Sequence, residues 1–173
     1  MKHKFLLLYS FFIRSLLFFL PDMPFIMRFR GWLYGLGMNH CGVNFQVSHS
    51  AIINSLECYY IGDNVYIANF CNFIGNGLIK IESEVIFGPG VVISAGNHQF
   101  LNNSFRFSKS KPLNVTIKRG SWIAANCTIV GECVFPTESI LAANSVFIKK
   151  SINKPNSLYG GNPARVIKSL KIK

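Results

Sequence analysis

Between Ile117 and Phe147 the amino-acid sequence repeats every six residues. The first place of each hexapeptide holds a large apolar residue: Ile117, Ile123, Ile129, Phe135, Leu141 and Phe147. The fifth place holds a small residue: Ser121, Cys127, Cys133, Ser139 and Ser145. Six residues are too few for a repeat of paired helices and too many for plain strand alternation, but they suit a β-solenoid. The pattern therefore predicts triangular coils of three hexapeptides, with the bulky residue pointing inward and the small residue near a corner.

A looser array of the same kind begins near Val43, with its best hexapeptides at Ile61, Ile67, Ile81 and Phe87. The period breaks over residues 94–112 and restarts near Val115. That interrupting segment is polar and basic, and a long loop on a rigid scaffold commonly carries function. We therefore expect the solenoid at residues 37–150, with a protruding loop at 94–112.

The two ends of the chain differ from the repeat. Residues 5–20 are almost wholly apolar, but this stretch is shorter than the roughly 20 residues that cross a bilayer. We expect residues 1–36 to form short helices that lie on a membrane surface or cap the open end of the solenoid, two roles that are compatible. Residues 151–173 form a basic C-terminal tail.

The charge balance limits the partners. The 18 basic and 7 acidic residues give a net charge of +11, which favours a membrane surface or a phosphorylated cofactor or substrate. Nucleic acid is disfavoured, because the charge is spread over three segments without a recognisable binding motif. The five cysteines are odd in number and lack CxxC spacing. Three of them, Cys71, Cys127 and Cys133, fall on small inward places of the repeat. They predict buried thiols in a reducing compartment rather than a metal site.

One histidine stands at a functionally suggestive place. His98 begins the segment that interrupts the repeat, directly after Ser94-Ala95-Gly96-Asn97. Histidine can take a proton from a hydroxyl near neutral pH, so His98 is a candidate general base. The alternative is an ordinary surface residue on a loop. The remaining histidines are terminal or near the start of the solenoid: His3, His40 and His49.

With these features in place, the sequence resembles the hexapeptide-repeat acyltransferases, particularly the sugar and surface-polysaccharide O-acetyltransferases. The resemblance spans residues 61–168 and lies in the order of four stretches: Tyr66-IANFCNF, Ile93-SAGNHQ, Gly120-SWIAANCTIVGECVF and Gly160-GNPARVIK. It implies an all-β solenoid, a left-handed parallel β-helix with an N-terminal helical segment and a C-terminal tail. It also implies transfer of an acetyl group from acetyl-CoA to a sugar hydroxyl of a surface glycan or its precursor, with no metal.

The resemblance implies a role for particular residues at the acceptor end. His98 looks like the general base. Asn69, within the Ala-Asn-Phe match, would face the acceptor or the developing oxyanion. The alternative interpretation of Asn69 is a corner residue in the left-handed backbone conformation. Asn97 and Arg106 belong to the loop that would shape the acceptor site.

Five further residues match positions that bind coenzyme A in the family. Trp122 would lie beside the groove, and the small side chains of Ala125 and Ala143 would leave room for the pantetheine arm. Arg165 and Lys168 would lie near the adenosine phosphates, where charge-assisted hydrogen bonds favour cations. For Trp122 the alternative is an exposed aromatic on a coil face, and for the two cations it is solvated charge.

The family is typically homotrimeric, with each active site between two subunits, so His98 and Asn69 would face Trp122 and the tail of a neighbour. Acetyl-CoA supply and free thiols imply a cytoplasmic location, at the inner face of the membrane if residues 1–36 bind it. Gln99 follows His98 where the galactoside and maltose enzymes have Pro, which favours the branch that acts on surface glycans.

Other functions stay open. An N-acetyltransferase acting on an amino sugar, or a xenobiotic acetyltransferase, is the runner-up, since a histidine base serves either nucleophile. A non-catalytic solenoid scaffold is a third class. A zinc carbonic anhydrase on the same fold is excluded, because it needs three histidine ligands and only His98 is suitably placed.

Overall fold

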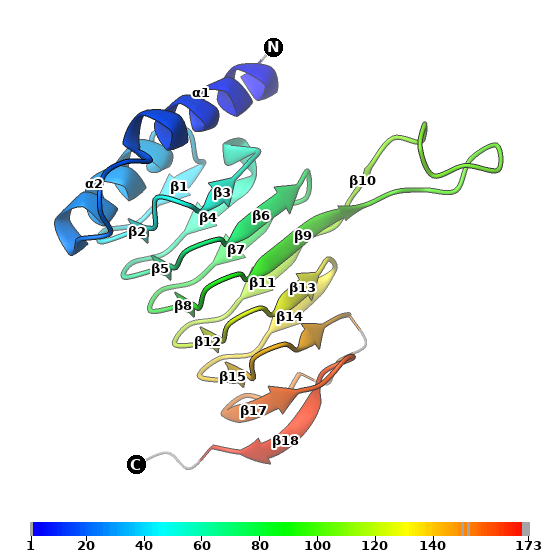
Figure 1. The fold of residues 1–173 in the computed structure, drawn as a ribbon. Coiled ribbons are helices and arrows are strands. Elements are labelled where there is room, and N and C mark those ends of the chain that lie inside the picture. The colour runs from blue at the N-terminus through cyan, green and yellow to red at the C-terminus, as the bar shows by residue number, and fades with distance from the viewer. Residues whose placement is uncertain (1, 150, 152, 171–173) are drawn as a thin grey trace.

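A computed structural model describes residues 2–149, 151 and 153–170. Two helices are followed by a stack of short strands that wind into coils (Figure 1). The stack is an all-β solenoid, a left-handed parallel β-helix, so the expected fold class is confirmed. The expected tail folds in part as two strands, and its residues 171–173 lie outside the described residues.

The three faces of the solenoid are parallel sheets, which we call sheets A, B and C. Sheet A contains β1 (His40–Cys41), β4 (Tyr59–Ile61), β7 (Ile79–Ile81), β11 (Val115–Ile117) and β14 (Cys133–Phe135). Sheet B contains β2 (Gln46–Val47), β5 (Tyr66–Ile67), β8 (Ile86–Phe87), β12 (Trp122–Ile123), β15 (Ile140–Leu141), β17 (Ser157–Gly160) and the antiparallel β18 (Arg165–Ser169). Sheet C contains β3 (Ile52–Ile53), β6 (Asn72–Gly75), β9 (Val92–Asn97), β13 (Thr128–Val130) and β16 (Val146–Phe147). A short 3-10 helix, η1 (Leu56–Cys58), turns the chain from sheet C back to sheet A.

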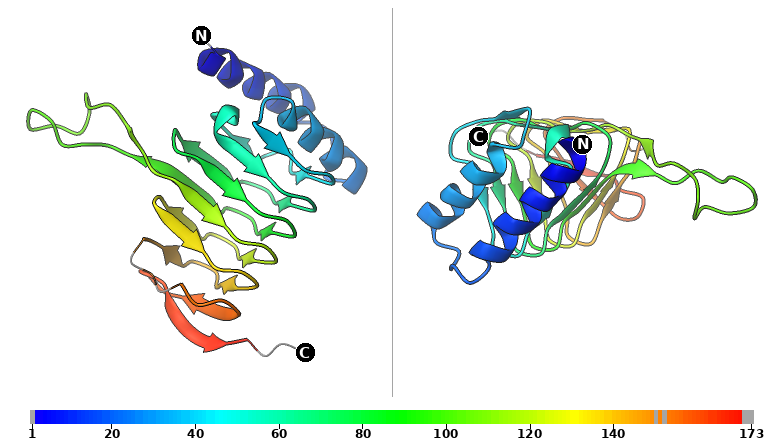
Figure 2. Two further views of the ribbon diagram at one scale, coloured as in Figure 1. Left: turned by 180° about the vertical axis from the view of Figure 1, so that it is seen from behind. Right: turned by 90° about the horizontal axis from the view of Figure 1, so that it is seen from above.

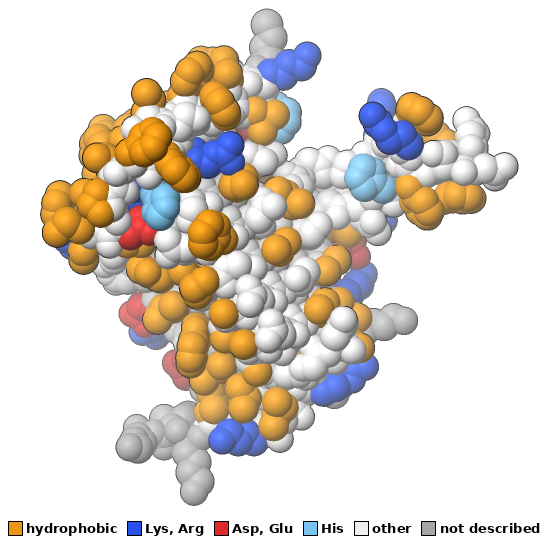
Figure 3. Space-filling model, viewed as in Figure 1, with side chains coloured by type: hydrophobic (Ala, Val, Ile, Leu, Met, Phe, Trp, Pro, Cys, Tyr) orange, Lys and Arg blue, Asp and Glu red, His pale blue; other side chains and the backbone are white. Residues whose placement is uncertain are grey.

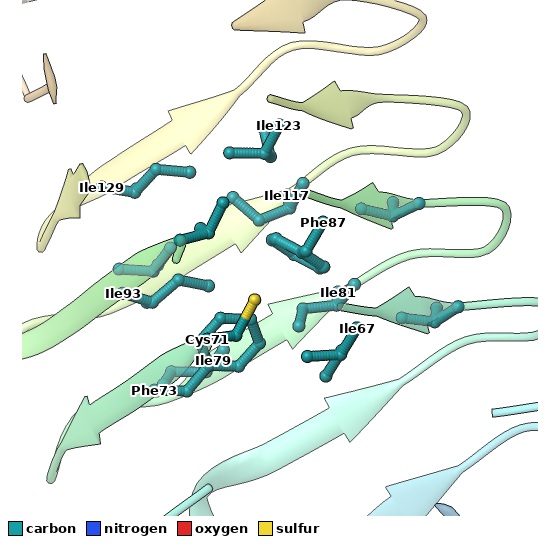
Figure 4. Close-up of a cluster of buried hydrophobic side chains, with 14 of the residues drawn as sticks. Ile67, Cys71, Phe73, Ile79, Ile81, Phe87, Ile93, Ile117, Ile123 and Ile129 are labelled. Carbon is teal, nitrogen blue, oxygen red and sulfur yellow. The ribbon is translucent and has the colours of Figure 1, made fainter. Parts of the chain in front are cut away.

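The hexapeptide pattern works as predicted. Each first-place residue of the Ile117–Phe147 array is buried, and so is each small fifth-place residue. In Figure 4, Ile67, Phe87 and Ile123 project inward from successive strands of sheet B. Burying one such side chain stabilises a protein by about 1.5–3 kcal/mol. The large first-place residues therefore form the core of the solenoid, and the small fifth-place residues allow the chain to turn at the corners.

The corners hold a feature that the hexapeptide pattern did not predict. The fourth residue of each hexapeptide has a positive φ: Gly120, Asn126, Glu132, Glu138 and Asn144. Glycine and asparagine tolerate this left-handed conformation, whereas it strains a glutamate by roughly 1 kcal/mol. The backbone conformation at Glu132 and Glu138 is thus held by the stacked coils rather than by local preference.

We predict that Glu138→Asn raises the free energy of unfolding by about 0.5–1 kcal/mol, because asparagine relieves left-handed strain. Glu138 is exposed, with φ 51°. Denaturant unfolding would measure the gain. Glu138→Ala is the matched control, since it removes the same charge without favouring the left-handed conformation, and an equal gain in both variants would contradict the explanation.

The N-terminal helices cover one end of the solenoid (Figure 2, right). Helix α1 spans Lys2–Leu17, and Pro21 follows it in the connector. Helix α2 spans Pro24–Gly35 and begins with proline, whose fixed φ suits the first turn. Ile13 and Tyr34 join the core of the solenoid. The helices therefore cap the solenoid, which is one of the two roles expected of residues 1–36.

Beyond β9 the chain leaves the solenoid as a long arm (Figure 1). The returning strand β10 (Lys111–Pro112) pairs antiparallel with the end of β9, Lys111 opposite Asn97. Ser94 and Ala95 still pair with the neighbouring coils, so the projecting part begins after Asn97. His98 is consequently at the base of the arm.

Candidate active site

A polar cluster lies where the connector between α1 and α2 meets the first coils. At its centre is Asp22, whose Oδ1 accepts hydrogen bonds from Arg30 Nη1 (3.1 Å) and the His49 backbone N–H (2.9 Å). Asp22 Oδ2 accepts from Ser48 Oγ (2.6 Å), and it lies 3.1 Å from His49 Nδ1. The amide of Asn69 donates to the same oxygen at 3.0 Å. One carboxylate thus ties helix α2 to two successive coils.

The electrostatics of this cluster keep Asp22 ionised. Burial raises the pKa of Asp22, but the hydrogen bonds from Ser48 and His49 outweigh it, so the pKa lies below its usual range. The Arg30 guanidinium, only 1% exposed, also donates to the Val47 carbonyl at 2.6 Å. The negative charge of Asp22 therefore neutralises a buried cation.

Asp22 also fixes the orientation of His49. A carboxylate can only accept hydrogen bonds, so the Nδ1 atom of His49 must carry a hydrogen. This leaves the Nε2 atom for other partners. The His49 side chain is 28% exposed and can therefore meet a ligand. The cluster offers a fixed imidazole and a fixed amide next to each other.

Asn69 lies at a corner of the solenoid without adopting the left-handed backbone conformation. The positive φ at this corner belongs to Phe70 (60°) and not to Asn69. The left-handed interpretation of Asn69 is therefore wrong. Asn69 is half-buried, and its NH₂ group is engaged by Asp22. The hydrogen bond to Asp22 therefore fixes the orientation of the Asn69 amide.

A row of small residues continues from Asn69 along the solenoid axis. The register of sheet B aligns Asn69 with Pro89, Ala125, Ala143 and Gly161 at the same corner. The coils are joined there by backbone hydrogen bonds, such as the one from Asn144 N to Ala125 O at 3.0 Å. At about 4.8 Å per strand, the row from Asn69 to Gly161 is roughly 19 Å long. We call it the small-residue row.

The cations predicted to bind phosphate lie on the strand that follows the last residue of this row: Arg165 pairs with Gly160 beside Gly161, and Lys168 pairs with Leu158. Arg165 and Lys168 are both exposed on β18, which closes sheet B. Trp122, 47% exposed on β12, lies on the outer face of the same sheet. The five residues proposed for coenzyme A therefore share sheet B and its corner.

His98 lies elsewhere. Asn69 precedes sheet C and His98 follows it, so they occupy opposite ends of its strands. With six residues in β9 and about 3.3 Å per residue, the two ends are roughly 20 Å apart. The structure does not bring His98 and Asn69 together within one chain. A site that uses both would take one residue from each of two chains.

The predicted acceptor-loop residues lie on the same arm as His98, away from Asn69. Asn97 helps to line a hollow of about 480 Å³ at the base of the arm, together with Lys111, Val130 and Lys149. Arg106 lies farther out on the arm, where its guanidinium lies 5.5 Å from the Phe107 ring centroid. Both residues are exposed.

Sequence reasoning missed Asp22, Arg30, Ser48 and His49. A signal was present, since Asp22 is the single acidic residue of the first 36 and stands between Pro21 and Pro24. An isolated acid in an apolar segment commonly has a buried partner, and Arg30 supplies it. What the sequence could not show is that both meet the corner of Asn69.

The cysteines have no chemical role in this cluster. All five lie within the described residues and are unpaired. Burial raises the pKa of Cys71 to about 11 and that of Cys133 to about 12, so both thiols stay protonated at neutral pH. Within the part of the chain that the structure describes, no three His, Cys, Asp or Glu side chains are grouped to hold a metal ion.

Comparison with known proteins adds relatives by sequence and by fold. No family model matches the sequence. The Saccharomyces cerevisiae protein YJL218W, described as a candidate acetyltransferase, is 25% identical over 133 residues, which cover 77% of this chain and 67% of that protein.

Two solved structures share the fold. A maltose O-acetyltransferase from Clostridium difficile superimposes with a TM-score of 0.79 at 22% identity, covering 96% of this chain and 87% of that one. A hexapeptide-repeat acetyltransferase of Vibrio cholerae, solved with acetyl coenzyme A, gives a TM-score of 0.75 at 22% identity, with 98% and 89% covered. At such identities the likeness establishes the fold.

Proposed function

We propose that this protein transfers an acetyl group from acetyl-CoA to a hydroxyl of a sugar in a surface glycan or its precursor. The observation that carries the proposal is the small-residue row, which has the polar cluster at one end and Arg165 and Lys168 at the other. A pantetheine arm extended along it would place the thioester near Asn69 and the phosphates near the cations. The acetyl-CoA held by the Vibrio cholerae protein of the same fold supports this assignment.

The reaction needs a base near the acceptor. His98 of a neighbouring chain would take the proton of the sugar hydroxyl as its oxygen attacks the thioester carbonyl. The carbon–sulfur bond then breaks, and coenzyme A leaves as a thiol after receiving a proton from His98. Asn69 would donate a hydrogen bond to the acceptor or the developing oxyanion, and the Nε2 atom of His49 would accept one from a sugar hydroxyl. Holding both substrates in one groove supplies the proximity that makes a covalent intermediate unnecessary.

Because His98 and Asn69 lie at opposite ends of sheet C, we propose that the active protein is a homotrimer with sites between chains. The base of the arm would then face the small-residue row of the next chain. Three equivalent sites follow from the cyclic symmetry of such an assembly.

The direct test is acceptor-dependent thiol release from acetyl-CoA by the purified protein, with sugars and surface oligosaccharides as acceptors. Products that hydroxylamine deacetylates are esters and support transfer to oxygen. Products that resist hydroxylamine are amides. They would show that the acetyl group goes to the nitrogen of an amino sugar and not to a hydroxyl. If well-folded protein neither releases thiol nor binds coenzyme A, the enzyme proposal fails and the protein is a non-catalytic scaffold.

We predict that Arg165→Ser with Lys168→Ser raises the KM for acetyl-CoA about tenfold, because each exposed charge-assisted contact to phosphate contributes about 0.7 kcal/mol. The matched control is the substrate S-acetylpantetheine, which lacks the adenosine phosphates. Its KM should be the same for both proteins. An equal loss with both substrates would mean that the cations do not meet the phosphates.

A further inference from the structure

The outer face of helix α1 is apolar and exposed. The helix buries Leu6, Ser10 and Ile13 against the rest of the protein. The opposite face presents Leu8 (54% exposed), Phe11 (50%) and Phe12 (50%), and Phe19 beyond the helix is 89% exposed. Lys4 is on this face too, one turn before Leu8.

Helix α2 has the same organisation. Met27, Arg30, Gly31 and Tyr34 are buried. The other face carries Phe25, Phe29, Trp32 and Leu36, which are 48–62% exposed and recur at helical spacing. The rings of Phe29 and Trp32 stack with centroids 5.9 Å apart. In Figure 3 hydrophobic side chains gather over the two helices. We call the two exposed faces together the helical apolar surface.

The extent of this surface requires a partner. Single exposed apolar side chains are ordinary, but contiguous aromatic patches on a protein mark an interaction site. Among the described residues no helix is long and apolar enough to cross a membrane. Helices that are apolar on the outside yet too short to span are suited to lying in the interfacial region of a bilayer.

Charge identifies the partner as anionic. Lys2, Lys4 and Arg28 are exposed on or beside the two helices, and Arg14 is half-buried. The one acidic residue of this segment, Asp22, is engaged by Arg30 and the polar cluster. Two copies pressed together through this surface would bring like charges together, whereas anionic lipids contribute about 1 kcal/mol per basic residue near the headgroups. The charges therefore favour lipid over a second copy.

We propose that α1 and α2 bind the surface of a bilayer that contains anionic lipids, with their outer aromatic side chains inserted among the headgroups. Phe18 connects this surface to the candidate site. It is 47% exposed, and its ring lies 5.3 Å from that of His49. The bound protein would hold the polar cluster at the bilayer. If the proposed function is correct, the acceptor is therefore a saccharide carried on a lipid.

The test is co-sedimentation of the full chain with vesicles of phosphatidylcholine alone or with added phosphatidylglycerol. We expect binding to the anionic vesicles that weakens with salt. Phe12→Ser with Phe29→Ser should reduce it at least tenfold, because each buried phenyl group contributes about 1.5–3 kcal/mol. The matched control is Phe105→Ser with Phe107→Ser on the arm, also exposed aromatics, which should bind as the unchanged protein does.

A second readout follows insertion directly. In a Trp122→Phe background, Trp32 is the sole tryptophan. Its emission should shift to the blue when anionic vesicles are added. No binding at low salt, or equal binding by the helix and arm variants, would overturn the proposal. Light scattering that shows a larger assembly, dissociated by the helix substitutions, would assign the surface to a second copy instead. Vesicle binding needs no acetyl-CoA, so its failure is distinct from failure of the proposed function.

Discussion

Replacing His98 with alanine is expected to lower kcat/KM for acetyl transfer by about 10²–10⁴-fold, the usual contribution of a positioned general base. The affinity for acetyl-CoA should stay unchanged, since the residues proposed for the cofactor lie on sheet B. Thiol release at saturating acetyl-CoA measures the loss. His40→Ala is the matched control, because His40 is another exposed histidine of the solenoid. If His98→Ala kept its activity, the base would have to be another group, with His49 the first candidate.

The location of the two halves of the site gives a sharper form of this experiment. Chains with His98→Ala and chains with Asn69→Ala should each be nearly inactive when alone. Refolded together, they should regain part of the activity, since some interfaces would pair an intact His98 with an intact Asn69. Recovery requires a site shared between chains. Mixtures that stay inactive while assembling normally would contradict a site that combines His98 of one chain with Asn69 of another.

Removing Asp22 is expected to destabilise the fold by about 3 kcal/mol, the lower end of the cost of breaking a buried ion pair, because Asp22 is partly exposed. It should also impair acceptor binding. Asp22→Ala leaves the Arg30 guanidinium buried without its counter-ion. Removing one partner of a buried ion pair destabilises a protein more than replacing both partners by apolar residues. Unfolding in denaturant near neutral pH measures the change. The double variant Asp22→Ala with Arg30→Leu should recover part of the stability, because no uncompensated charge stays buried. Equal stability of the single and double variants would contradict this account.

The same carboxylate predicts a pH dependence. The pKa of Asp22 is lower in the folded protein than in the unfolded chain. Its stabilising contribution is therefore complete above the unfolded pKa and is lost as the pH falls through the folded one. The difference in stability between the unchanged protein and Asp22→Ala should shrink below about pH 4. A constant difference down to strongly acidic pH would mean that Asp22 acts through packing alone.

The solenoid could be predicted because its information is local. One bulky and one small residue per hexapeptide suffice to fix the strand, the inward direction and the turn, and the coils then stack in register. The polar cluster is different, since Asp22, Ser48 and Asn69 are distant in sequence and meet only because the helical connector folds back onto the first coils. No period links these residues.

The separation of His98 from Asn69 could have been anticipated from the same repeat. Successive coils place residues such as Asn69 and Pro89 at one corner. His98 lies nine positions after Pro89, half a coil away, and so belongs to a different corner. The order of the motifs in the sequence does not give their distances in the fold. Two residues that were matched to one site can therefore lie at opposite ends of a sheet.

The two ends of the stack are closed by different devices, helices at the start and the antiparallel strand β18 at the finish. Every coil of a regular solenoid offers the next one the same unpaired backbone edge, so a bare stack is a template for its own elongation. The helices cover this edge at the start of the stack, and at the finish β18 pairs with the last parallel strand of sheet B in the opposite direction. A further coil added in the parallel sense would therefore not find the edge of sheet B that the repeat offers elsewhere.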